Sequence, residues 1–224
     1  MITPKQSLIF LCLFFLPSLS FAEFQSNDEI AIQLIAASKD YPIQQRIKTQ
    51  SGVLLNTPYD QNPLYRFDYF DCETYVDTVM ALVLAKNLTD FRSKINQIRY
   101  KQANVNFTQR NHFPSADWIP NNKKNGFIRE LTYFIAGQKT KVSRAQINRR
   151  SWYHYLTADR IQIAYLTPQE KESRLTQLKS EGETLYFSKK VSIAYIPVFE
   201  LLRNPKLRQK IPSGSLIFFV GHDT

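Results

Sequence analysis

The chain contains two cysteines, and one of them, Cys12, lies in a segment with the features of an export signal. Residues 1–22 combine an early positive charge, a short apolar run and a small-x-small ending at Ala22, which is typical of a cleaved signal peptide. We expect the mature chain to begin near Glu23 and to carry a single, unpaired thiol, Cys72. Because an exported protein meets oxidants, such a thiol is usually either deeply buried or chemically active.

Composition predicts that residues 23–224 form a single domain. About 200 residues are enough to bury a sizeable core, and sixteen Phe and twelve Tyr against six Gly are typical of a globular protein. The formal charge of +10 suits acidic partners. However, the basic residues are scattered and no stacking motif accompanies them, which argues against nucleic acid as a partner. The apolar run of the signal is too short to span a bilayer comfortably, so no stable membrane anchor is expected.

Hydrophobic periodicity and capping residues predict helices first and strands last, which indicates an α+β domain. The segment 126–137 fits helix and strand equally well, and 101–125 is expected to be a long irregular loop. Helices are predicted near residues 28–35, over 72–86, from a cap at Thr89 or Asp90 to Tyr100, from Pro168 to about Ser180 with a stop by Gly182, and over 198–202. Strands are predicted at 184–187, 191–196 and 215–220.

Asp71 is a good helix N-cap, which places Cys72 at the first helical position. Unpaired backbone N–H groups and the positive end of the helix dipole favour a thiolate there. The charges of Asp71 and Glu73 oppose this effect. The alternative is that Cys72 is a small apolar residue buried on the inner face of the helix. The residues alone leave both interpretations open.

A catalytic thiolate needs a base, normally histidine, and the chain has three. His112 lies in the polar, aromatic stretch, where ring stacking is the ordinary role. His154 stands among aromatic residues, where packing is the ordinary role, and His222 lies three residues from the end. No two of them have the spacing of metal ligands, so neither a metal nor another cofactor is expected.

Several motifs resemble the bacterial N-acetylmuramoyl-L-alanine amidase-like family, which is related to the NlpC-type papain-like cell-wall cysteine peptidases. The order and spacing of an Asp-Cys motif, an Arg-Asn-His motif and an Asp-Trp motif make the resemblance fairly specific. The matching residues are Phe70 to Val76, Ile98 to Tyr100, Arg110 to Phe113, Asp117 to Ile119 with Asn121 or Asn122, and Ser213 to Phe219.

The resemblance implies a papain-like α+β fold, with the nucleophile helix packed on a small antiparallel sheet. In such families the catalytic histidine sits on a strand beyond the one that 215–220 resembles, whereas this chain stops at Thr224. We therefore expect the last strands to be missing and the domain 23–224 to be incomplete. The base is then a histidine beyond the end, His222 or His112, or else His154 or none.

The resemblance also implies an activity. Cys72 would attack an amide of peptidoglycan, either a stem-peptide bond or the bond to muramic acid, after export to the periplasm or outside the cell. Arg110 suits a substrate carboxylate, and Tyr59, Asp117 and Trp118 are further candidate substrate-binding residues. The alternative is an inactive homologue that binds the cell wall and lacks the general-base histidine.

Overall fold

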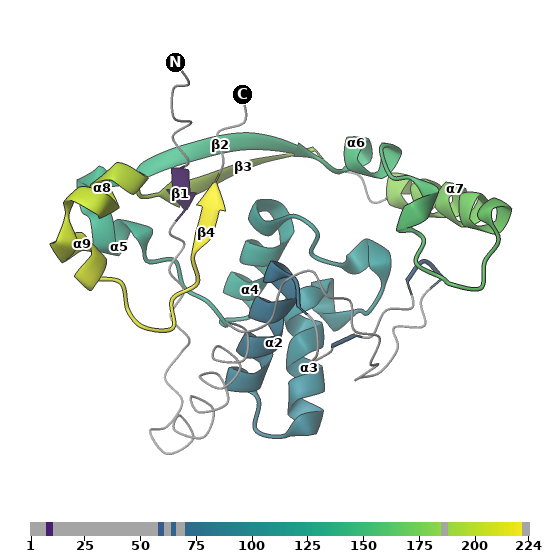
Figure 1. Cartoon of the computed structure of the whole chain (residues 1–224), viewed down its shortest axis with the longest axis horizontal. Helices are drawn as coiled ribbons and strands as arrows, with labels where there is room; N and C mark the ends of the chain where they lie inside the picture. The colour runs from purple at the N-terminus through teal and green to yellow at the C-terminus, as the bar shows by residue number, and fades with distance from the viewer. Residues whose placement is uncertain (1–7, 11–57, 61–63, 66–69, 185–187, 221–224) are drawn as a thin grey trace. The chain divides into compact units, whose positions relative to one another are not determined.

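The structure is a computed structural model, and it describes residues 8–10, 58–60, 64–65, 70–184 and 188–220. Most of the expected signal peptide 1–22, the expected helix near 28–35 and His222 lie outside these residues. Helices and two small sheets are both present, which confirms the α+β class (Figure 1). None of the helices in the described ranges is long and apolar enough to cross a membrane.

The contacts group the chain into two compact units. Unit 1 comprises Met1–Pro17, Phe113–Ile147 and Lys189–Thr224, and unit 2 comprises Ser18–His112 and Asn148–Ser188. Each unit has its own cluster of buried apolar side chains. The expectation of one domain, incomplete at its end, stays a prediction.

Unit 2 contains the helix that begins at the cysteine. Helix α2 (Cys72–Leu84) packs against α3 (Leu88–Arg99), and α6 (Arg149–His154) packs against α7 (Pro168–Thr184). Short 3-10 helices lie at Lys101–Ala103, Phe107–Gln109 and Ala158–Arg160. The buried cluster of this unit consists of Tyr59, Tyr153, Leu156, Ile161, Ile163, Leu175 and Leu178.

Unit 1 is built from short helices and two two-stranded sheets. A π-helix at Pro114–Trp118 leads into α4 (Ile119–Lys124), and α5 (Thr132–Ala136) and a 3-10 turn (Gly137–Lys139) precede β2 (Lys141–Asn148). After β3 (Ser188–Tyr195), which pairs with β2, come α8 (Val198–Arg203) and α9 (Pro205–Gln209). Strand β4 (Phe218–Val220) pairs antiparallel with β1 (Leu8–Phe10).

Three segments differ from the sequence-based expectations. Helix α3 is capped by Asn87, whose side chain accepts from the Asp90 N–H at 2.9 Å, and not by Thr89 or Asp90. The segment 101–125 is a series of short helical turns and not an irregular loop. Of the expected strand 184–187, Thr184 is the last residue of α7 and 185–187 lie outside the described residues.

Helix α7 begins as expected at a capping box, because Thr167 and Glu170 exchange side-chain to backbone hydrogen bonds of 2.8 and 3.3 Å. It does not stop by Gly182 but continues to Thr184. A Cβ at Gly182 would lie 2.8 Å from two ring carbons of Tyr153. The glycine therefore lets α6 and α7 approach closely and does not end the helix.

We expect Gly182→Ala to destabilise the protein by about 1–3 kcal/mol, because the added methyl group overlaps the fully buried Tyr153 ring. This cost has to exceed the gain of about 1 kcal/mol in helix propensity. Ser173→Ala, an exposed position of α7, is the matched control and should be neutral or slightly stabilising. Equal urea denaturation midpoints for the two variants would show that the close approach costs nothing.

Candidate active site

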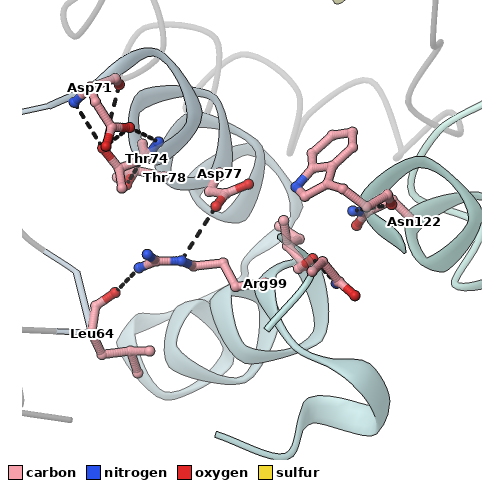
Figure 2. Close-up of polar contacts among 10 residues, drawn as sticks. Leu64, Asp71, Thr74, Asp77, Thr78, Arg99 and Asn122 are labelled. Carbon is pink, nitrogen blue, oxygen red and sulfur yellow. Dashed lines mark hydrogen bonds and ion pairs between the residues drawn. The ribbon is translucent and has the colours of Figure 1, made fainter. Parts of the chain in front are cut away.

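The start of α2 is fixed by a reciprocal pair of hydrogen bonds that bracket the cysteine (Figure 2). The Thr74 N–H donates to Asp71 Oδ1 at 2.7 Å, and the Asp71 N–H donates to Thr74 Oγ1 at 3.0 Å. This capping box places Cys72 at the first helical residue, as the sequence predicted. The backbone around the sulfur is therefore held by two neighbours whose side chains bond to each other.

The Cys72 side chain is exposed and forms no disulfide. The alternative that it is a buried apolar residue is therefore wrong for this structure. The buried face of α2 is formed instead by Asp77, Thr78, Met80, Ala81 and Val83. An accessible thiol at a helix start, where the first N–H groups have no preceding helical carbonyl to bond, is suited to nucleophilic chemistry.

A buried ion pair joins α2 to α3. Asp77 Oδ2 lies 3.4 Å from Arg99 Nε, and the two side chains are only 1% and 6% exposed (Figure 2). Arg99 also donates from Nη1 to the Leu64 carbonyl. At this separation the pair is an ion pair with long geometry and not a close hydrogen bond. It holds the inner face of the cysteine helix against its neighbour.

Arg110 is tied to the end of α3 by the backbone around it. Tyr100 and Arg110 form an antiparallel bridge, and the Asn111 N–H donates to the Arg99 carbonyl at 2.9 Å. The buried Asn111 side chain donates from Nδ2 to the Ile98 carbonyl at 3.0 Å. The chain returns to α3 through Gln102 and Ala103, which both have positive φ.

Glu73, in the first turn of α2, feels the positive charge of Arg110. Burial raises the pKa of Glu73, the residue after the cysteine, while the positive charges of Arg110 and Arg99 act in the opposite direction. The sequence interpretation treated Glu73 only as an adverse charge. The structure instead shows a half-buried carboxyl group whose pKa is raised by burial and by Asp71, an effect that Arg110 and Arg99 only partly oppose.

His112 lies in an aromatic environment within unit 2. Its ring centroid is 4.6 Å from that of Trp152 and 4.9 Å from that of Phe107, and its Nε2 lies 3.0 Å from the Phe107 carbonyl oxygen, to which it donates. Burial, reinforced by the charge of Arg110, lowers the pKa of His112 to about 3, although the bond to Phe107 opposes the shift. No hydrogen bond joins His112 to Cys72, both of which the structure describes. The ring is therefore neutral at physiological pH and suited to packing.

This environment predicts a pH dependence of stability. Because the folded-state pKa of His112 is about 3 and that of an unfolded histidine is about 6.5, the unfolded chain binds more protons between these values. Stability that is present above pH 6.5 is lost as pH falls, by about 2 kcal/mol between pH 7 and pH 5. His112→Gln should flatten this slope in urea denaturation. His154→Gln, at an exposed position, should not, and identical slopes in all three proteins would contradict the assignment.

The other candidate substrate-binding residues are buried, one in unit 2 and two in unit 1. Tyr59 is 1% exposed in the buried cluster of unit 2, where burial and the neighbouring Glu181 carboxylate raise its pKa. Asp117 and Trp118 are buried in unit 1, and the Trp118 ring lies 5.7 Å from that of Phe218. Asp117 Oδ2 accepts from the Phe113 N–H at 3.4 Å. Their roles in substrate binding stay predictions.

Sequence reasoning missed two parts of this arrangement. The Asp77–Arg99 pair had only one sequence signal, a charged residue at an inward position of each helix. Asn111 stood inside the Arg-Asn-His motif, but its anchoring role depends on the position of α3, which local sequence does not give. Within the described residues, no group of three or more His, Cys, Asp or Glu side chains is placed to hold a metal ion.

Comparison with known proteins gives two informative matches. The sequence model of the family described as AmiA-like, N-acetylmuramoyl-L-alanine amidase-like, matches residues 47–223. The crystal structure of a Legionella pneumophila protein assigned to the DUF1460 family is similar, with 32% sequence identity and a TM-score of 0.72 over 86% of this chain and 69% of that one.

A putative xylanase from Bacteroides fragilis matches at 21% identity and a TM-score of 0.39, over 56% of this chain and 52% of that one. The comparison with curated proteins found no match.

Proposed function

Because the chain belongs to the N-acetylmuramoyl-L-alanine amidase-like family, we propose that it is an exported hydrolase that cleaves an amide bond of peptidoglycan through the Cys72 thiolate. The family description points to a peptidoglycan amide as the substrate class. The bond is either the one between muramic acid and L-alanine or one within the stem peptide. The periplasm, or the outside of the cell, is the proposed place of action, in keeping with the signal-like residues 1–22.

The observation that carries the proposal is the exposed thiol at the first residue of a capped helix. The thiolate sulfur attacks the amide carbonyl carbon, and the carbonyl electron pair moves to the oxygen. When the tetrahedral intermediate collapses, the C–N bond breaks and the leaving amine takes a proton from the general acid. Water then hydrolyses the thioester and restores the thiol. The Cys72 N–H, which has no helical carbonyl before it, is the proposed donor to the oxyanion.

The proposed base is a histidine outside the described residues. His112 stays a candidate, but its low pKa and its bond to the Phe107 carbonyl make it a weak proton acceptor at neutral pH. Among histidines outside the described residues, His222 is the candidate that this sequence contains. His222→Ala should therefore lower amide hydrolysis more than His112→Gln does, provided that the rates are compared at a pH where both proteins are folded.

Arg110 is the proposed partner of a substrate carboxylate. Its charge acts on Glu73, which adjoins the thiol in sequence, and its backbone is fixed to α3. Stem peptides carry carboxylates that a guanidinium binds in a bidentate manner. A papain-like, NlpC-type arrangement of the whole domain is part of the same proposal and is supported by the helix that starts at the cysteine.

Alkylation of the thiol tests the proposal. We expect iodoacetamide to abolish the release of new amino groups from purified muropeptides, and mass spectrometry should place the single adduct at Cys72. A Cys12→Ser background removes the second thiol of the sequence while leaving the expected site intact. Undiminished hydrolysis by fully alkylated protein would refute the thiolate mechanism, as would a complete lack of hydrolysis by the unmodified chain.

A further inference from the structure

Unit 1 exposes a group of large apolar side chains on two neighbouring helices. Helices α5, α8 and α9 share a buried cluster that includes Ile135, Leu201 and Leu207 and lie together in Figure 1. On the sides of α5 and α8 that do not enter this cluster, Phe134 is 80% exposed and Leu202 is 70% exposed. We call the four such residues, Tyr133, Phe134, Phe199 and Leu202, the α5–α8 patch.

The residues that follow the patch are strongly basic. Between Val198 and Ile211 the sequence has four cations and one acid, Glu200. The cations are the exposed Arg203, Lys206, Arg208 and Lys210. Glu200 forms an ion pair with Lys139, so its charge is already balanced inside unit 1. The side of the α5–α8 patch next to the end of α8 and α9, its basic border, is therefore positive, whereas Glu130 just before α5 is bonded to the Thr132 N–H. The complement of the basic border is an anionic surface.

Exposed hydrophobic side chains beside cations are typical of surfaces that bind anionic membranes. Aromatic and aliphatic side chains insert at the boundary between head groups and acyl chains, while lysine and arginine are attracted to anionic head groups. An acidic protein partner would match the charge, but it would not by itself account for isolated Phe and Leu side chains held outward on short helices. We propose that the α5–α8 patch and the basic border on α8 and α9 dock reversibly onto an anionic phospholipid surface.

The docking is peripheral. The helices involved have five or six residues, far below the length that spans a bilayer. A few inserted side chains with a handful of cations give weak binding that depends on salt. Docking would hold the protein at a membrane face without a permanent anchor. This proposal does not depend on the thiol chemistry, so vesicle binding and hydrolysis can fail separately.

The test is vesicle co-sedimentation of the full chain with phosphatidylglycerol and phosphatidylcholine mixtures and with phosphatidylcholine alone. We expect measurable partitioning on the anionic vesicles only, weakened by added salt. Phe134→Ser with Leu202→Ser should lower the partition coefficient at least tenfold. Lys206→Gln with Lys210→Gln should lower it about fivefold per charge at low salt.

The control must remove comparable exposed apolar side chains elsewhere, because a chain of charge +10 binds anionic vesicles to some extent in any case. Leu88→Ser with Tyr165→Ser removes two exposed apolar side chains of unit 2 and should leave partitioning unchanged. Equal losses in the patch and control variants would overturn the proposal, and so would an unaffected patch variant.

A measurement of oligomeric state and a fallback variant complete the test. Sedimentation velocity that shows a dimer broken by the patch substitutions would assign the patch to a second copy and overturn lipid docking. Should Phe134→Ser with Leu202→Ser fail to fold, Leu202→Ser alone carries the same expectation with a smaller loss. The lysine variant, whose two positions are exposed, then decides the charge dependence.

Discussion

Replacement of Asp77 by alanine is expected to lower the free energy of unfolding by about 3–5 kcal/mol. The variant leaves the Arg99 guanidinium buried with its carboxylate partner removed, because both side chains lie inside the α2–α3 interface. The remaining bond from Arg99 to the Leu64 carbonyl cannot offset a full positive charge. Urea denaturation followed by circular dichroism measures the loss.

A double substitution separates the charge effect from packing. Asp77→Leu with Arg99→Met removes both charges and keeps apolar volume, so it should recover much of the stability lost in Asp77→Ala. Glu183→Ala, which breaks the exposed pair with Arg150, is the surface control and should change stability by less than about 1 kcal/mol. Similar losses of unfolding free energy in Asp77→Ala and Glu183→Ala would mean that the buried pair contributes no more to stability than the exposed one.

Substitution of Cys72 by alanine is expected to lower amide hydrolysis by at least about a thousandfold, close to 4 kcal/mol of transition-state stabilisation. The fold should be unaffected, because the side chain is exposed and Asp71 and Thr74 hold the helix start. Cys72→Ser should be almost as inactive, because a hydroxyl is far less ionised than a thiol. The assay follows new amino groups released from a muropeptide.

Leu88→Ala is the matched control for this substitution. Leu88 is also the first residue of a capped helix and is also exposed, yet it lies at the start of α3. Its substitution should leave both activity and stability nearly unchanged. A Cys72→Ala protein that hydrolyses muropeptides at the rate of Leu88→Ala would remove the thiol from the mechanism.

The sequence predicted those elements whose signals are local. Asp71 as the cap of α2 and the Thr167–Glu170 box at the start of α7 need only side chains within one turn, and both are confirmed. The helix at 198–202 is confirmed with one more residue. Strands expected at 191–196 and 215–220 are found over 188–195 and 218–220, which is the usual uncertainty of element ends.

Elements that depend on distant partners were missed. Strand β2 (Lys141–Asn148) contains four polar or charged residues that are exposed, so it lacks the apolar run that marks a strand, and its pairing with β3 comes from a segment about 40 residues away. Gly182 reads locally as a helix stop, but its role depends on the Tyr153 ring of α6. Tertiary contacts override local preference in both cases.

In the candidate site, too, features set by neighbouring residues were predictable and features set by distant residues were not. The position of Cys72 was predictable because the capping box is adjacent in sequence. The burial of Tyr59 and Trp118 was not, because an aromatic residue in a polar stretch suits a cleft and a core equally well. The environment of His112 was anticipated only as ring stacking, and its low pKa follows from burial and from Arg110.

The two hydrogen bonds from Asn111 to the end of α3, one from its backbone N–H and one from its side chain, bear on the design of covalent inhibitors. Since α3 also packs on α2, the backbones of Arg110 and Cys72 are both attached to one helical pair. If Arg110 binds a substrate carboxylate as proposed, a compound that joins an electrophile to an acidic group should engage both residues without any rearrangement of that pair. A compound with a flexible spacer should bind less tightly than one with a stiff spacer of matching length, because the flexible spacer loses more conformational entropy on binding.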